Sequence, residues 1–252
     1  MSSTIAALEK TIFAKGRDDP IKALDSDADP QTVFYLNPVG PEGLVGSSSS
    51  DGARYLQQTL YLWATRIEST VSEKLKTPPN EHGSARASWN RASFRSKLLD
   101  NLMRSTPWMA MRGDAAENTG SSPLTGNYNH DKRIFRDIVM SALQDKGIPI
   151  NNERLAIIPN YISEAMTLAA DTLEKVQRFA ILLPDAGGDE MSRGSMKLVV
   201  IGFERAGSEV KTSNMGYEAI LNGRLFEDQK LDENVLSTGK AIVQRMTVDY
   251  VT

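Results

Sequence analysis

The stretch NERLAIIPNYISEAMTLAADTLEKVQ, residues 152–177, and three apolar runs that follow it decide the fold. The runs are RFAILLP (178–184), SMKLVVIGFERA (195–206) and SNMGYEAILNGRLFED (213–228). Apolar residues in the first stretch recur at spacings of three and four, which is typical of an amphipathic helix, whereas the runs have the length and composition of strands. This part of the chain is therefore predicted to be a helix that leads into a sheet.

The start of the helix is predicted near Asn160. Asparagine is a good N-cap, and a proline such as Pro159 is tolerated only in or before the first turn. Arg154–Ile158 is accordingly predicted to be a short strand or a separate turn. The residues expected on the packed face of the helix are Ile162, Met166, Ala169, Leu173 and Val176.

The strands differ in how much of them is predicted to be buried. Phe179–Leu183 and Met196–Phe203 are apolar at consecutive positions, which indicates strands covered on both faces. From Met215 onward apolar and polar residues alternate, which indicates a half-exposed strand. The glycine-containing connections at 187–188 and 206–208 are too short for crossover helices, so an antiparallel sheet is expected.

Further elements are predicted from the same periodicities. They are helices at Ser3–Lys15, Ala53–Lys76, Asp131–Lys146 and Asp232–Tyr250, a short strand at Thr32–Leu36, and loops at Gly40–Gly52 and Met111–Asn129. The predicted class is α+β, with amino-terminal helices packed on a carboxyl-terminal, mainly antiparallel sheet and a closing helix. Residues 1–252 are predicted to form one domain, helical to about residue 150.

The composition limits the chemistry. The chain of 252 residues has a net charge of −3 and no cysteine, which excludes disulfides, thiolate catalysis and thiolate metal sites. No apolar run approaches the ~20 residues that a membrane-spanning helix needs, and the first residues lack the pattern of a secretory signal peptide. A cytoplasmic protein is expected.

The segment from Arg86 to Arg112 has an unusual charge, with six basic residues and one acidic residue, Asp100. Its apolar residues make it a predicted basic amphipathic helix, which can engage phosphates, anionic lipid headgroups or an acidic protein surface. The alternative is that it neutralises the more acidic remainder of the same fold. The predicted contact residues are Arg86, Arg91, Arg95, Lys97 and Arg104, with Trp89 as the apolar anchor.

No catalytic residue, metal ligand or cofactor is predicted. The two histidines, His82 and His130, belong to no spaced ligand set. Ser237–Lys240 ends like a phosphate-binding loop, but Asn234 occupies the place of the first glycine. The acidic loop Asp185–Glu190 has oxygen donors for a hard cation, but acidic hairpin tips are common.

These features favour a non-enzymatic interaction or assembly protein, for example a viral or phage structural component. Its partner would be another protein or a second copy, or else nucleic acid or an anionic membrane surface contacted through residues 86–112. An enzyme with carboxylate or serine chemistry that forms no recognisable motif is one alternative.

The other alternative is a membrane-active, pore-forming protein. Asn160–Ile162 and Val199–Glu204 are similar to parts of the Cyt-type cytolysins. The similarity covers a handful of positions, and their spacing along the chain differs from that of the family. It therefore assigns no family. The pore-forming alternative depends on long strands flanked by amphipathic helices that could peel away, which is the arrangement of soluble pore formers.

Overall fold

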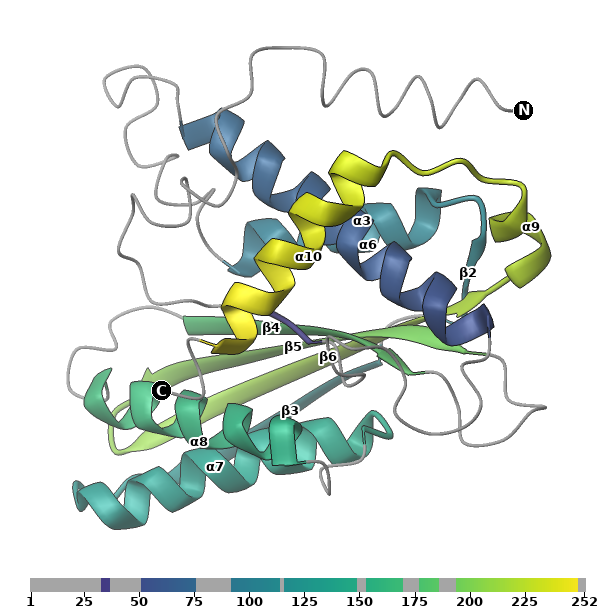
Figure 1. Ribbon diagram of the computed structural model, residues 1–252. Coiled ribbons are helices and arrows are strands. Elements are labelled where there is room, and N and C mark those ends of the chain that lie inside the picture. The colour runs from purple at the N-terminus through teal and green to yellow at the C-terminus, as the bar shows by residue number, and fades with distance from the viewer. Residues whose placement is uncertain are drawn as a thin grey trace.

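The computed structural model describes residues 33–36, 51–75, 92–113, 116–148, 153–169, 177–185 and 194–248. Elements carry the labels of Figure 1. The helices are α3 (Asp51–Leu75), α6 (Ala92–Ser105), α7 (Tyr128–Asp145), α8 (Glu153–Ala169), α9 (Gly223–Glu227) and α10 (Glu233–Val248). The strands are β1 (Val33–Tyr35), β2 (Met109–Met111), β3 (Ala116–Pro123), β4 (Gln177–Asp185), β5 (Ser195–Ala206) and β6 (Glu209–Leu221).

The six strands form one sheet in the order β1-β4-β5-β6-β2, and β3 pairs with β6 beyond the end of β2. The pairs formed by β4 with β5 and by β5 with β6 are antiparallel, and so are those of β2 and β3 with β6. β1 runs parallel to β4. The α+β class and the mainly antiparallel sheet are confirmed.

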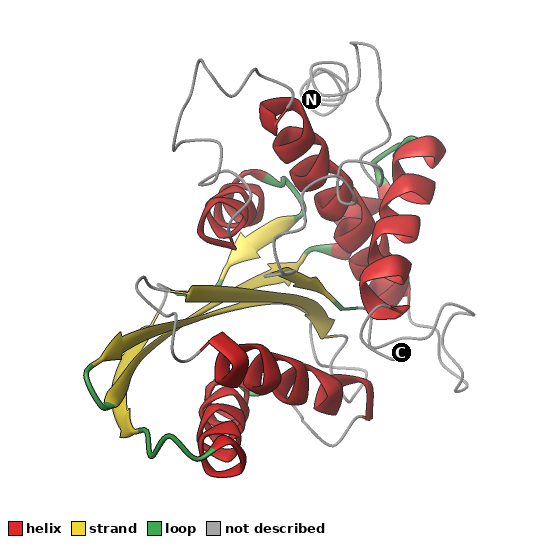
Figure 2. Ribbon diagram, turned by 90° about the vertical axis from the view of Figure 1, so that its left-hand side faces the viewer, coloured by secondary structure: helices red, strands yellow, loops and turns green. Residues whose placement is uncertain are grey.

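Helices cover both faces of this sheet (Figure 2). α3, α6 and α10 lie on one face, and α7 and α8 lie on the other (Figure 1). Each face has its own core: Trp63 and Leu198 belong to the first, and Phe135 and Ile201 to the second. β4 and β5 therefore need apolar residues at consecutive positions, as the sequence has them, because alternate side chains enter opposite cores.

The predicted start of the second long helix is wrong. α8 begins at Glu153 and continues through Pro159, so Arg154–Ile158 is helical and Asn160 is not a cap. A proline inside a helix removes one backbone hydrogen bond and favours a kink. Here Ile158 and Ile162, on either side of the proline, are both buried in the same core, and their burial offsets that cost.

The predicted loop Met111–Asn129 is also wrong, because it contains all of β3 and the first two residues of α7. β3 has the sequence AENTGSSP, which lacks the apolar alternation of a half-buried strand. Its pairing with eight residues of β6 makes it a strand. β6 in turn starts at Glu209 and ends at Leu221, and the remainder of the third run forms α9.

The remaining predicted elements fall into two groups. The strand at Thr32–Leu36 and the helices at Ala53–Lys76, Asp131–Lys146 and Asp232–Tyr250 are confirmed as β1, α3, α7 and α10. Their bounds shift by a few residues. The predicted helix Ser3–Lys15 and most of the predicted loop Gly40–Gly52 lie outside the described residues.

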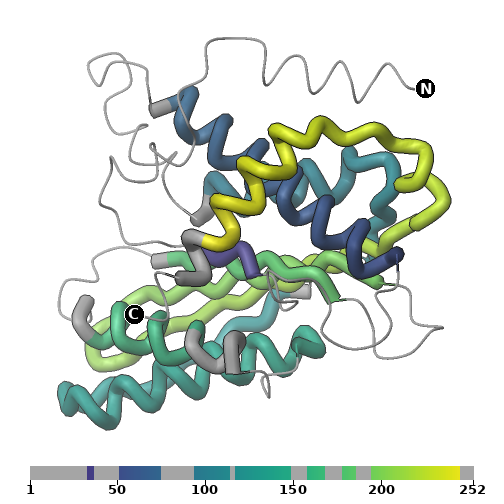
Figure 3. The backbone as a smooth tube through the Cα atoms, in the orientation of Figure 1, coloured from purple at the N-terminus to yellow at the C-terminus, as the bar shows by residue number. Residues whose placement is uncertain are grey.

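α10 crosses α3 at very short range (Figure 3). Gly239 lies at the crossing, and a Cβ atom there would be 2.0 Å from the carbonyl oxygen of Tyr61. Thr65 makes hydrogen bonds through its hydroxyl with the carbonyl oxygens of Tyr61 and Val235, both at 2.9 Å. Only glycine permits this approach, so the closing helix is fixed against the longest one. Among the described residues, no helix is long and apolar enough to cross a membrane.

Candidate functional site

The predicted contact residue Arg95 lies inside the fold. Its Nη2 and Nε atoms donate to the Glu68 carboxylate at 2.9 and 3.0 Å, and the Tyr35 hydroxyl donates to the same carboxylate at 2.6 Å. All three residues are buried. Burial, followed by the charge of Glu68, raises the pKa of Tyr35 well above its ordinary value, so Tyr35 remains a donor. This network joins β1, α3 and α6.

The predicted basic surface is therefore smaller than the sequence indicates. The guanidinium of Arg95 is occupied by Glu68, and Arg104 donates to Asp100 at 2.8 Å one helical turn away. Lys97 is exposed on α6. Arg86, Trp89 and Arg91 lie outside the described residues, so the structure places only Arg95, Lys97 and Arg104 of the predicted contact residues. The alternative explanation is that the basic segment neutralises acidic residues of the same fold. The ion pair of Arg95 with Glu68 is a contact of that kind.

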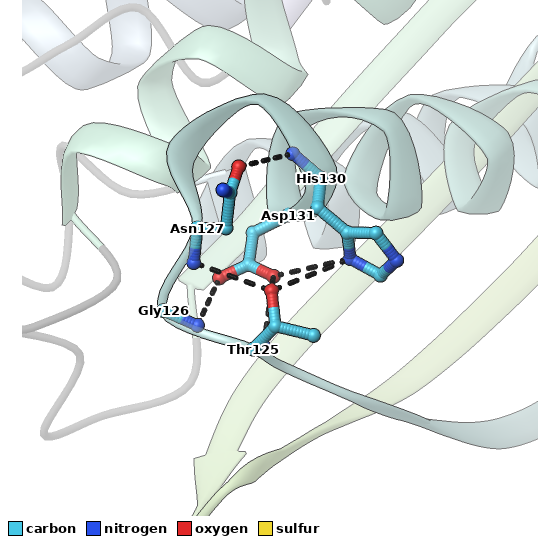
Figure 4. A network of polar contacts seen from close by, with 5 residues as sticks. All are labelled: Thr125, Gly126, Asn127, His130 and Asp131. Carbon is cyan, nitrogen blue, oxygen red and sulfur yellow. Dashed lines mark hydrogen bonds and ion pairs between the residues drawn. The ribbon is translucent and has the colours of Figure 1, made fainter.

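His130 lies beside a carboxylate and a hydroxyl, at the start of α7 (Figure 4). Asp131 accepts hydrogen bonds from the backbone N–H of Thr125, the hydroxyl of Thr125 and the backbone N–H of Gly126, each at 2.9 Å. The side chain of Asn127 caps the helix by accepting from the N–H of His130. Although burial opposes it, these bonds hold the pKa of Asp131 below its ordinary value.

This arrangement differs from a catalytic triad. In a triad the two ring nitrogens of histidine contact different groups, one the acid and one the nucleophile. Here Nδ1 of His130 is the nitrogen near both, 3.4 Å from the Thr125 hydroxyl and 3.6 Å from Asp131. The Thr125 hydroxyl donates directly to Asp131, so the base does not lie between them. The network orders the turn that leads from β3 into α7.

A further polar cluster lies near the start of β5, on the face of the sheet that α7 and α8 cover. The hydroxyl of Ser195 donates to Glu218 at 2.8 Å, and Arg112 approaches the other oxygen of Glu218 at 3.4 Å. Lys197 donates to Asp185 at 2.8 Å and to the carbonyl oxygen of Gly147 at 3.1 Å. A hydroxyl bound to a carboxylate is a geometry used in general base catalysis. Ser195 is buried, however, which separates its hydroxyl from an incoming substrate.

The most accessible candidate surface is the outer side of β3. Eight consecutive residues, Ala116–Pro123, pair with β6 on one side, and among the described strands none pairs with the other side. Glu117, Asn118, Thr119, Gly120 and Ser121 are all exposed. A long, exposed edge strand presents backbone donors and acceptors to a further strand. We call residues Ala116–Pro123 the open edge.

Sequence reasoning missed the open edge because its composition is that of a loop. Gly120, Ser121, Ser122 and Pro123 are typical turn residues, and strand prediction depends on apolar alternation. The proline at the last position and the helix cap at Asn127 are the signals present, since both mark the ends of an element. Within the described residues, no group of three or more histidine or carboxylate side chains could hold a metal ion.

No protein-family model matches the sequence, and no curated protein is significantly similar to it. Among solved structures, the chain is similar to one described as "Structure of the Evf virulence factor". The superposition has a TM-score of 0.39 and 9% sequence identity, and it covers 93% of this chain and 90% of that chain.

Proposed function

We propose that the protein acts by binding and assembly, and that it presents a surface to a partner instead of converting a substrate. The observation that carries this proposal is the open edge, an eight-residue strand with exposed side chains and a free hydrogen-bonding side within the described sheet. Edge strands of this length are usually shortened, charged, bulged or covered, because they otherwise pair with other chains.

The polar clusters support the same proposal, because each has a structural task. The Asp131 network caps α7, and the Tyr35–Glu68–Arg95 network joins β1 to two helices. In the first network the Thr125 hydroxyl already donates to Asp131, and in the second all three residues are buried. The proposal therefore depends on a positive feature, the open edge, and on side chains that are engaged within the fold.

The experiment is a measurement of molar mass by light scattering coupled to size-exclusion chromatography, from about 1 to 100 μM protein. An assembly protein elutes at a mass above the 27.7 kDa of one chain, and this mass rises with concentration. A constant mass of one chain at every concentration contradicts self-assembly and leaves only a partner other than a second copy of the chain.

We also propose that the basic segment, residues 86–112, binds an anionic partner, although with fewer contact residues than the sequence predicts because Arg95 is buried. Of the predicted contact residues, Lys97 and Arg104 are exposed on α6, and Arg86, Trp89 and Arg91 lie outside the described residues. Binding through such a segment weakens steeply with salt. A titration with a nucleic acid duplex and with anionic vesicles at 50 and 200 mM salt measures it, and salt-independent binding would contradict it.

A membrane-active protein is the second candidate. It is favoured by the length of β5 and β6, 12 and 13 residues, and by the helical cover on both faces of the sheet. Release of either helical layer would expose the apolar side chains of β4 and β5. Leakage of a dye from anionic vesicles is the test, and vesicles that stay intact at micromolar protein rule it out.

A further inference from the structure

Within the part of the chain that the structure describes, the usual protection of an edge strand is present only at the two ends of the open edge. Natural edge strands carry lysine, proline or inward-pointing charges that prevent pairing. β3 has no lysine, its proline is the last residue, and its one charged residue, Glu117, is near the other end. The central residues Asn118–Ser122 are small and uncharged, so another strand can approach closely.

The strand places its side chains on the two faces in a fixed order. Asn118, Gly120 and Ser122 are cross-strand partners of Asn214, Thr212 and Val210. Val210 is part of the core under α7 and α8, so the even-numbered residues of β3 face that side. Glu117, Thr119 and Ser121 face the opposite side, beside Met215, Ser213 and Lys211.

We propose that the open edge pairs with the open edge of a second copy of this chain, antiparallel, with Thr119 opposite Thr119 on the two-fold axis. The inference rests on the proposed function and names the partner and the register. In this arrangement the sheet continues through both copies, and residues that face one side in the first copy face the same side in the second.

The positions of the charged residues favour this register over its neighbour. With Thr119 on the axis, Glu117 of one copy lies opposite Ser121 of the other, and the next residue in that row is Lys211 of the other copy. The short serine lets the glutamate and the lysine reach each other. Asn118 then lies opposite Gly120, which leaves room for the amide, and two threonines form a favourable cross-strand pair.

A neighbouring register that also preserves the faces has Gly120 opposite Gly120. It places Glu117 opposite Pro123 of the other copy, and the next residue in that row is Glu209. This brings two carboxylates into one row. Like charges near each other across strands destabilise the pair. The register with Thr119 on the axis instead places Lys211 in the row of Glu117, with Glu209 as a diagonal neighbour that the Ser121 hydroxyl holds at 2.7 Å. Each of the two registers pairs seven residues of each copy.

The absence of cysteine from the sequence allows a direct test of the register. A disulfide needs Cα atoms about 4.4–6.8 Å apart, which residues directly opposite each other on neighbouring strands satisfy. Thr119→Cys is therefore expected to form a disulfide-linked dimer of the full chain under mild oxidation, about tenfold faster than Glu117→Cys. The two copies of position 117 would be about 14 Å apart along the strands.

Single and mixed samples complete the cross-linking test. Glu117→Cys and Ser121→Cys alone stay monomeric on denaturing gels, and a one-to-one mixture of the two forms the linked dimer. Gln144→Cys, an exposed position on α7, is the control for random collision. Equal cross-linking of all the variants, or cross-linking of Glu117→Cys alone, overturns the proposed register.

A charge exchange tests the same row without cysteine. Ser121→Glu lies opposite Glu117 of the other copy and is expected to weaken association about tenfold, because each dimer contains the repulsion twice. Within one chain it lies opposite Lys211, but it loses the 2.7 Å hydrogen bond from the Ser121 hydroxyl to Glu209, so the free energy of unfolding of each variant is measured beside its association. Adding Glu117→Lys to Ser121→Glu restores an attractive pair and the association. Ser141→Glu on the exposed side of α7 is the matched control.

Sedimentation equilibrium of the wild-type chain and these variants separates the two proposals. The pairing is supported if association weakens in Ser121→Glu and is restored when Glu117→Lys is added. Association of the wild type that none of the open-edge variants changes overturns the pairing and leaves assembly through another surface. A wild type that is monomeric at all concentrations overturns the pairing, and it also removes self-assembly from the proposed function.

Discussion

The two edges of the sheet differ in length, burial and surroundings. β1 forms one edge with three residues, all of them buried. Helices pack against it, and Tyr35 ties it to Glu68 and Arg95. β3 forms part of the opposite edge with eight residues whose side chains are mostly exposed. One sheet therefore has a closed edge and an open edge.

Because of this difference, residues at the closed edge stabilise the fold, whereas residues at the open edge can contact a partner. At the closed edge a charged network is buried inside a helical layer, so its members stabilise the fold and are not available to a partner. At the open edge the side chains are small and polar, and they contribute little to the core. Substitutions should therefore unfold the protein at one edge and change only its association at the other.

Among the substitutions that are expected to leave a folded protein, Arg95→Met at the closed edge should have the largest effect. This change leaves the buried carboxylate of Glu68 with the Tyr35 hydroxyl but without its cation. Breaking a buried ion pair by removing one partner costs about 3–5 kcal/mol. The free energy of unfolding, measured in urea, should fall by that amount. Arg104→Met is the control, because its ion pair with Asp100 is exposed and should change the value by less than about 0.5 kcal/mol.

A combined variant shows whether the missing partner is the cause. Replacing the whole network with Tyr35→Phe, Glu68→Leu and Arg95→Met removes every charge and polar group at once. Buried ion pairs replaced by apolar side chains of similar size are often neutral in stability. The triple variant should therefore recover most of the loss. A triple variant less stable than Arg95→Met would show that the network itself supplies the stability.

Gly239→Ala should have the next largest effect, because α10 packs on α3 above the closed edge. The new Cβ would lie 2.0 Å from the carbonyl oxygen of Tyr61 and 2.7 Å from the Thr65 hydroxyl. A backbone atom cannot rotate away, so the two helices must separate. Overpacking of this kind costs about 1–3 kcal/mol, measured again in urea. Gly223→Ala meets its nearest atom at 3.8 Å and should change stability much less.

The asymmetry of the edges also explains which elements could be predicted from the sequence. α3 and β5 are confirmed because their apolar residues have the period of a helix and the density of a two-faced strand. β3 was not predictable, because an exposed edge strand needs no apolar residues. Arg95 was misassigned to a surface because its partner, Glu68, is 27 residues away in the sequence and becomes its neighbour only when two helices pack.

An effect of about 1 kcal/mol, dependent on pH, is expected from Asp131→Asn beside the open edge. The amide would direct an N–H donor at the donors of the Thr125–Gly126 turn, and a buried donor without an acceptor costs about 1–3 kcal/mol. The folded pKa of Asp131 is lower than its ordinary value of 3.8. The ionised carboxylate therefore stabilises the native state above that pH, and this contribution disappears as the pH falls through the folded pKa.

The difference in the free energy of unfolding between wild type and Asp131→Asn should therefore be full at pH 7 and shrink below pH 3.8. Urea unfolding at several pH values measures it. Asp137→Asn, an exposed change on the same helix, is the control. A difference that stays constant down to pH 3 would show that the charge of Asp131 contributes nothing.

The smallest effect is expected from one lysine placed at the open edge, and the same change at the closed edge gives the sharpest contrast. Thr119→Lys introduces a charge at an exposed position and should alter the free energy of unfolding of the monomer by less than about 0.5 kcal/mol. Val33→Lys places the same charge at a buried position and should prevent stable folding. Both are measured at the lowest workable concentration, because association would otherwise add to the apparent stability.

If Thr119→Lys unfolds the monomer, the outer side of β3 is covered within a single chain, and the distinction between a closed and an open edge is wrong. If it leaves the monomer intact but abolishes the dimer, the cost of the charge lies at the interface between two copies, because Thr119 would then face its own counterpart.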